Sequence, residues 1–241
     1  MSEPSSPRLN RFLASCGLGS RRGCESLILE GRVQVNGVTC RNLATRIGQD
    51  DVIVADGRRL TPEKKTTILL HKPPGCICTR SDPQARQTIY DLLPPHLHHL
   101  HHVGRLDLDS QGLLILTNCG EITQRLTNPK HKIEKEYVVL LSRPFPPQLQ
   151  SRLVEGISTP EGFARATSVT LISRRRVCLT LEQGLKRQIR LMFEALGNSV
   201  TQLERTRIGS LTDSSLPLGK WRHLTAVEIA SIWRKPRGNS S

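Results

Sequence analysis

Two carboxylates that could do chemistry, Asp107 and Asp109, lie in the segment GRLDLDSQGLLILTN. The apolar run GLLILT predicts a buried strand, and rigid scaffolds often present reactive groups at strand ends. An aspartate beside Arg105 can stay ionised while partly buried, because the nearby positive charge offsets the lost hydration. Such a carboxylate is a usable nucleophile. Spacing alone, however, favours a plain solvated turn at this position.

Histidines are concentrated just before this segment, at His96, His98, His99, His101 and His102. Histidine is a common metal ligand. The spacing does not suit a pair on one face of a helix, and no carboxylate accompanies these residues before Asp107. We therefore predict no functional metal site, and we expect these side chains either to contact RNA or to have no partner.

The composition points to a partner rich in phosphates. The 241 residues include 35 Lys and Arg against 21 Asp and Glu, which gives a net charge of +14. No apolar run reaches the ~18 residues of a membrane span, and the first ten residues lack an apolar signal segment, so we expect a cytoplasmic protein. Seven cysteines at scattered spacings predict reduced structural thiols.

Residues 8–60 predict a small unit of two helices followed by a sheet. Ser20 is the expected N-cap of the second helix, which should end at Gly31. The dipeptide Asn36-Gly37 predicts a hairpin turn, and a last strand is expected at 52–54. The apolar positions follow helical spacing and then alternate: Leu9, Phe12, Leu13, Cys16, Val33 and Val35.

Three arginines of this unit occupy positions suited to RNA. Arg21 and Arg22 lie in the expected first turn of the second helix, where backbone N–H groups and the helix dipole favour phosphate, and Arg32 follows that helix. Exposed arginines without a role fit these positions equally well. The segment LNRFLASCGLGSRRGCESLILEGRVQVNG resembles the RNA-binding domain first described in a small-subunit ribosomal protein, the S-four type, over nearly all of residues 8–60. The resemblance implies that this unit binds structured RNA.

A polar linker at 61–65 precedes a second unit of mixed strands and helices. Strands are expected at 66–71, 76–79, 112–117 and 133–141, and helices near 149–154, at 189–196 and after a capping box formed by Thr225 and Glu228. The proline-rich stretch 143–147 should separate two subdomains. Because no regular βαβ alternation is present, we predict an α+β fold with a largely antiparallel sheet.

Five ordered blocks of this unit are similar to RNA pseudouridine synthases of the branch related to RsuA and RluB, which modifies bacterial ribosomal RNA. They are LHKPPGCICT, GRLDLDSQGLLILTN, HKIEKEYVVLL, EQGLKRQIRLMFEALG and TRIGSLTDSSLPLGKWRHLT. The resemblance implies that Asp107 is the catalytic aspartate, Tyr137 the base-stacking tyrosine and Arg190 the arginine that pairs with the aspartate. It also implies substrate contacts by Arg105, Lys135 and Arg187, and no cofactor.

These residue types suit the isomerisation of uridine. The reaction breaks the glycosidic bond, rotates the freed uracil and rejoins it through a ring carbon. The target base must leave its stack, and Tyr137 offers an aromatic face that offsets part of that cost. The sequence leaves open whether Asp107 attacks the sugar or the base, or assists elimination. Arg187 and Arg190, three residues apart, are expected to face away from the core of their helix.

The expected organisation is a disordered leader at 1–7, an RNA-binding domain at 8–60, a linker at 61–65, a catalytic domain at 66–235 and a flexible tail at 236–241. We expect a monomer that modifies ribosomal RNA in ribosome precursors, more readily that of the large subunit. One alternative is a non-catalytic assembly factor of the same fold. Another is a nucleoside glycosidase with Asp107 and Asp109 as its carboxylate pair, which the basic charge argues against.

Overall fold

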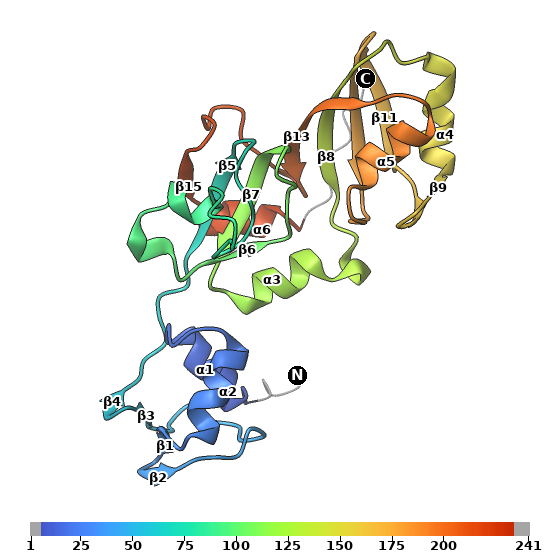
Figure 1. Ribbon diagram of the computed structural model, residues 1–241. Coiled ribbons are helices and arrows are strands. Elements are labelled where there is room, and N and C mark those ends of the chain that lie inside the picture. Colours follow the sequence, from blue (N-terminus) through green and yellow to red (C-terminus); the bar gives the residue numbers. More distant parts are fainter. Residues whose placement is uncertain (1–5, 234–241) are drawn as a thin grey trace. The chain divides into compact units, whose positions relative to one another are not determined.

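The computed structural model describes residues 6–233, which form two compact units (Figure 1). Along the chain, the first unit ends at Lys65 and the second begins at Thr66. Of the expected leader, only Ser6 and Pro7 are described, and their carbonyls accept hydrogen bonds from Arg46 Nη1 at 2.7 Å and Ile47 N at 3.1 Å. These two residues are therefore held by the first unit, contrary to the expectation of disorder. The expected tail lies outside the described residues.

The first unit contains both predicted helices and a four-stranded sheet of order β2-β1-β3-β4. Its elements are α1 (Leu9–Ser15), α2 (Arg21–Leu29), β1 (Val33–Val35), β2 (Val38–Thr39), β3 (Ile53–Ala55) and β4 (Arg58–Arg59). Ser20 caps α2, since its Oγ accepts a hydrogen bond from Gly23 N at 3.0 Å. The core consists of buried residues from every part of the predicted pattern: Leu9, Leu13, Cys24, Ile28, Val33 and Ile53.

Two tight turns close this sheet. Asn36 and Gly37 have φ of 52° and 81°, and Asp56 and Gly57 have φ of 49° and 76°. Positive φ at both central residues is the geometry of the hairpin turn that matches strand twist, so the first hairpin is confirmed. The strand expected at 52–54 was predicted to be the last of this unit, but after the second turn the chain continues into β4, which pairs with β3.

The second unit is built on a nine-stranded sheet whose main path is β11-β12-β8-β13-β7-β5-β15. Its strands are β5 (Thr67–Lys72), β6 (His101–Val103), β7 (Gln111–Thr117), β8 (Lys135–Leu141), β11 (Ser168–Ser173), β12 (Arg176–Leu181), β13 (Val200–Ile208), β14 (Leu211–Thr212) and β15 (Trp221–His223). A separate hairpin consists of β9 (Ile157–Thr159) and β10 (Gly162–Ala164). All pairs except β7–β13 are antiparallel among the described strands, which confirms the predicted α+β class.

Four α-helices of the described chain pack on this framework: α3 (Gly120–Thr127), α4 (Gln150–Glu155), α5 (Gln188–Ala195) and α6 (Ala226–Ser231). Helices α4 and α5 cover the part of the sheet made by β8, β11 and β12, where Phe193, Leu153 and Val177 belong to one core (Figure 1). A second core lies between β5, β7 and the loop that contains Tyr90, whose hydroxyl donates to Leu100 O at 3.0 Å. Tyr90 is thus the buried anchor that we expected.

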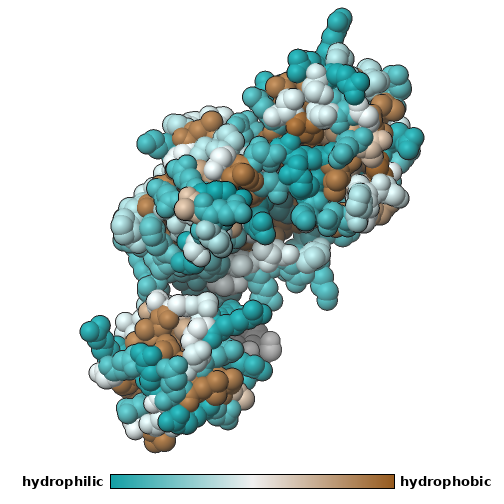
Figure 2. Space-filling model, in the orientation of Figure 1, coloured by the Kyte–Doolittle hydropathy of each residue, from teal (hydrophilic) through white to brown (hydrophobic). Residues whose placement is uncertain are grey.

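Two sequence predictions for this unit are wrong or incomplete. Residues 76–79 form no strand but a single bridge between Ile77 and Thr88, because Ile77 exchanges its hydrogen bonds with the loop at Gln87 and Ile89. Helix α3 was not predicted, since Ile122 and Leu126 give it only a short apolar stripe. No helix within residues 6–233 has both the length and the apolar character needed to cross a bilayer. Figure 2 accordingly shows a mostly hydrophilic face with small separate apolar patches.

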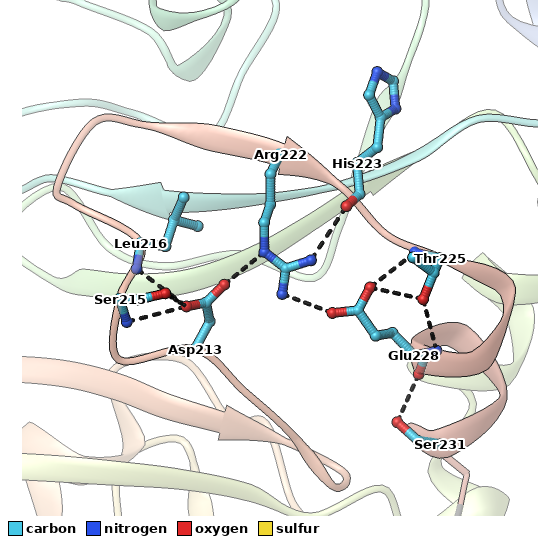
Figure 3. A network of polar contacts seen from close by, with 8 residues as sticks. All are labelled: Asp213, Ser215, Leu216, Arg222, His223, Thr225, Glu228 and Ser231. Carbon is cyan, nitrogen blue, oxygen red and sulfur yellow. Dashed lines mark hydrogen bonds and ion pairs between the residues drawn. The ribbon is translucent and has the colours of Figure 1, made fainter.

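The end of the described chain is fastened by Arg222, which bridges two carboxylates (Figure 3). Its Nε lies 2.6 Å from Asp213 Oδ2, and its Nη2 lies 2.7 Å from Glu228 Oε1. Glu228 also completes the predicted capping box with Thr225 at the start of α6. The Arg222 guanidinium and the Thr225 backbone lower the pKa of Glu228 to about 2. Arg222 therefore joins the loop after β14, strand β15 and helix α6.

We predict that Arg222→Met lowers the free energy of unfolding by about 2 kcal/mol at pH 7, because it leaves the Asp213 carboxylate, only 7% exposed, without its counter-charge. The folded-state pKa of Glu228 lies below its ordinary value, so the stabilisation is complete above about pH 4.5 and is lost as the pH falls towards 2. Urea titrations of both proteins from pH 7 to pH 3 should show their difference shrinking. The exposed Arg176→Met is the control, and an equal loss there would contradict the assignment.

Candidate active site

A cavity of about 680 Å³ opens in the second unit where β7, β8 and β13 meet the loops that precede β7 and α5. This volume is within the ordinary range for small-ligand sites. Five of the six residues predicted for catalysis or substrate binding line it: Arg105, Asp107, Lys135, Tyr137 and Arg187. Arg190 does not belong to the lining. Segments separated by more than 80 residues are thus brought to one hollow.

Asp107 lies half-buried in the turn that leads into β7. Ser110 N donates to Asp107 O at 3.1 Å and closes this turn. Within residues 6–233 the Asp107 carboxylate forms no hydrogen bond and no ion pair. It is therefore available to a molecule that enters the cavity.

The ammonium group of Lys72 binds the backbone of this turn. Lys72 is completely buried, and its Nζ donates to Ser110 O at 2.7 Å, to Asp107 O at 3.0 Å and to Pro73 O at 3.0 Å. An ammonium has three N–H donors, so all of them are used. Burial lowers the pKa of Lys72, while the negative charges of Asp107 and Asp109 oppose that shift.

Lys72 was not predicted as a site residue, although its position in the strand pattern indicates one. In β5 the side chains of Ile68 and Leu70 point into one core, and Lys72 is the next residue on the same side of the strand. A lysine at an inward position of a buried strand needs acceptors nearby. Here the acceptors are the carbonyls of the aspartate turn.

Gly112 fixes the other end of the turn against β13. Its φ is 119°, and a Cβ at this position would lie 2.4 Å from the backbone N and O of Arg205. This close approach occurs where β7 and β13 pair in parallel, with Gly112 beside Arg205. A side chain at 112 would push the two strands apart.

The expected ion pair between Arg190 and Asp107 is not formed. Arg190 Nη2 lies 3.0 Å from Asp109 Oδ2 and donates to Asp109 O at 3.2 Å, and its Nη1 donates to Val200 O at 2.8 Å. The two aspartates lie on opposite sides of the turn, so that Asp107 faces the cavity and Asp109 faces α5. Arg190 thus contacts the predicted segment through the other carboxylate.

The expected orientation of the two arginines near α5 also needs correction. Arg187 is not part of the helix: it precedes it in the left-handed region, with φ 51° and ψ 25°. Its Nη1 lies 3.9 Å from Asp109 Oδ2, and its side chain is 47% exposed. The Arg190 side chain is only 11% exposed and does not face solvent. Both arginines therefore fasten the aspartate turn to the start of α5.

Tyr137 and Lys135 project from β8 into the cavity on the same side of the strand. Tyr137 is 9% exposed and pairs across the sheet with Arg205. Lys135 Nζ donates to Ile133 O at 3.0 Å. Burial, together with the positive charge of Arg205, lowers the pKa of Lys135 to about 8. The cavity therefore holds one aromatic face and several cationic groups around Asp107.

The three arginines of the first unit differ in their freedom to bind RNA. Arg21 and Arg22 are exposed in the first turn of α2. Arg32, in contrast, forms two short contacts with Asp56, at 2.8 and 2.7 Å, and one with Glu30 at 3.3 Å. Its grouping with Arg21 and Arg22 as a free phosphate ligand is therefore not supported by the geometry.

Comparison with known proteins agrees with this arrangement of two units. Residues 66–195 match the family described as RNA pseudouridylate synthase, and residues 7–53 match the S4 domain. A ribosomal large subunit pseudouridine synthase B of Bacillus subtilis is 35% identical, with 93% of this chain and 95% of that protein covered. A ribosomal small subunit pseudouridine synthase A of Vibrio cholerae is 36% identical, with 94% and 100% covered. The chain also superposes on a crystal structure of a pseudouridylate synthase with a TM-score of 0.69. The two sequences are 35% identical, and the match covers 94% of this chain and 100% of the other. The chain belongs to the RNA pseudouridine synthase family and carries an S4 domain at its N-terminal end.

Proposed function

We propose that this pseudouridine synthase acts on a uridine of ribosomal RNA and that Asp107 is its nucleophilic carboxylate. The observation that carries the proposal is the unpaired Asp107 carboxylate, presented to a cavity that also contains Tyr137. A buried site with a carboxylate and an aromatic face suits a nucleotide that has left its stack.

The named relatives support ribosomal RNA as the substrate class. One is named for the large subunit and the other for the small subunit. We propose large-subunit RNA, in ribosome precursors and in the cytoplasm, as the substrate of a monomeric enzyme. Mapping pseudouridine in total RNA with and without the gene identifies the subunit and the position.

The positions of the cations, the tyrosine and the aspartate in the cavity fit one flipped nucleotide. Arg105, Lys132, Lys186 and Arg187 are exposed at its edge, where RNA phosphates pass. Tyr137 lies deeper and offers its ring to the base. Asp107 lies between these levels, half-buried, so that it can reach the sugar or the edge of the ring.

The S4 domain supplies affinity in this proposal. Its free Arg21 and Arg22 lie where backbone N–H groups and the positive end of α2 already favour an anion. All of the described residues that line the cavity belong to the second unit.

We expect Asp107→Asn to fold and to bind RNA but to lose pseudouridine formation by about a thousandfold or more, because the shape remains and the negative charge is removed. The assay is pseudouridine mapping on ribosomal RNA transcripts with purified protein. Asp109→Asn is the matched control, and it should cost about tenfold, because it weakens only the contacts with Arg190 and Arg187. Turnover by Asp107→Asn within tenfold of the parent would refute the nucleophile, as would a reversed order of the two variants.

We expect Arg190→Met and Asp109→Asn to act through one another. Each should slow the reaction at least about tenfold, and the double variant should be little slower than the worse single variant, because both remove the same contact. Single-turnover rates give the coupling energy. Independent, multiplicative effects would show that Arg190 does not act through Asp109.

RNA binding should depend on Arg21 and Arg22 but much less on Arg32. The double variant Arg21→Gln/Arg22→Gln should lower the slope of log affinity against log salt by ~1.5, since each lost phosphate contact contributes ~0.7 to 0.9. Arg32→Gln serves as the control, because that guanidinium is already engaged by Asp56. Titrations between 50 and 300 mM salt, roughly the range where such slopes are measured, decide the matter. Equal salt slopes for the parent protein and both variants would show that Arg21 and Arg22 of α2 do not contact RNA.

A further inference from the structure

Arg205 is a buried cation with an unused hydrogen-bond donor. It lies in β13, is 3% exposed and donates from Nε to Leu113 O at 2.7 Å. Its Nη2 is buried and has no hydrogen-bond partner within the described residues. A buried guanidinium donor without an acceptor is costly and rare in folded proteins, so it suggests an acceptor supplied from outside.

The place of Arg205 identifies where that acceptor would come from. Arg205 lines the 680 Å³ cavity, and across the β13–β8 ladder it is directly paired with Tyr137. Lys135, two residues from Tyr137 on the same face of β8, lines the same cavity, and the charge of Arg205 adds to the effect of burial in lowering the pKa of Lys135. The unused donor is therefore adjacent to the aromatic side chain of the site.

Depth separates Arg205 from the other cations of the cavity. Arg105, Lys132, Lys186 and Arg187 are exposed, whereas Arg205 is almost fully covered. Lys135 is half-buried, and its Nζ already donates to Ile133 O at 3.0 Å. A phosphate of an RNA strand stays at the surface with its strand, but a flipped base enters the interior. The acceptor that reaches Arg205 therefore belongs to the base.

We propose that Arg205 donates a hydrogen bond to the O4 carbonyl oxygen of the flipped uracil and thereby selects uridine over cytidine. The proposal rests on the proposed function. Uracil carries two carbonyl acceptors, O2 and O4, whereas cytosine has an amino group in place of O4. A buried donor that meets an amino group is left unpaired, which is the strongest form of discrimination available to such a site.

The symmetry of uracil gives this donor a partner before and after the chemical step. Rotation of the ring about its N3–C6 axis exchanges O4 with O2, and at the same time exchanges C5 with N1. The bond between N1 and the ribose C1′ breaks, the bond between C5 and C1′ forms, the proton of C5 leaves to solvent, and N1 gains a proton. Arg205 stays protonated throughout, and a carbonyl oxygen faces it in both orientations.

The test uses a short RNA that contains the uridine mapped with the parent enzyme, prepared with uridine, 2-thiouridine or 4-thiouridine at that position and tritium at C5. Sulfur accepts hydrogen bonds poorly, so the 4-thio substitution should slow tritium release by the parent enzyme about 10- to 100-fold, and more than the 2-thio substitution does. Arg205→Met should slow release from the uridine RNA by a similar factor, with the RNA dissociation constant changed less than about threefold. In Arg205→Met, the same thio substitution should slow tritium release less than about threefold relative to the uridine RNA.

Two further variants keep the result interpretable. Arg175→Met is the control, because Arg175 Nε donates to Leu141 O at 2.8 Å in the same manner but outside the cavity lining, and it should retain the full thio effect. If Arg205→Met does not fold, Arg205→Lys carries the test. Its shorter side chain can replace Nε at Leu113 O but does not extend to the Nη2 position, so its thio effect should also fall below about threefold.

The outcomes separate the two claims. A parent enzyme that converts no uridine in any ribosomal RNA contradicts the proposed function. A parent enzyme that converts uridine but shows no thio effect, or a folded Arg205 variant that keeps the full thio effect, overturns the role of Arg205 alone. A large loss of RNA affinity in Arg205→Met with an unchanged thio effect would instead show a phosphate contact.

Discussion

The active-site turn depends on one buried positive charge. Lys72 has no access to water, and its three donors are satisfied by backbone carbonyls, two of which belong to Asp107 and Ser110. An ammonium left without these acceptors would be strongly destabilising, so the turn has little freedom to open. The carboxylate of Asp107 is placed by a contact that leaves the carboxylate itself free.

The other constraints on the turn act from different sides. Gly112 allows β7 to approach the backbone of β13, and Asp109 is drawn towards the start of α5 by Arg190 and Arg187. Because these contacts use residues on either side of Asp107, the fold orders the turn and leaves the Asp107 carboxylate without a partner among the described residues. Most of the charged residues that line the cavity around it are cations, which suits an RNA substrate.

Local patterns in the sequence were sufficient for most of the elements. The cap at Ser20, the turn at Asn36-Gly37 and the capping box at Thr225 each depend on residues within a few positions, and all three are present. The matching motif blocks also contain five predicted site residues that line the cavity, although Arg190 is not among the lining residues.

Contacts between distant residues were beyond the reach of those patterns. The partner of Arg190 is 81 residues away, and which of two neighbouring carboxylates it meets depends on how the turn is oriented. The pairing of Arg32 with Asp56 likewise joins residues 24 apart. Neither Lys72 nor Arg205 was predicted as a site residue. Their roles follow from burial, whereas a lysine or arginine is most often exposed.

The central claim is that Lys72 holds the Asp107 turn in the geometry that the proposed reaction requires, and the most direct measurement combines turnover and amide hydrogen exchange in Lys72→Met. The account predicts that single-turnover pseudouridine formation falls by about a hundredfold or more while RNA affinity changes less than about threefold, since methionine fills the space but donates no hydrogen bond. It also predicts faster exchange in residues 106–112, with the first unit and β8 unchanged. A folded variant with near-normal turnover and normal exchange in that segment would contradict it.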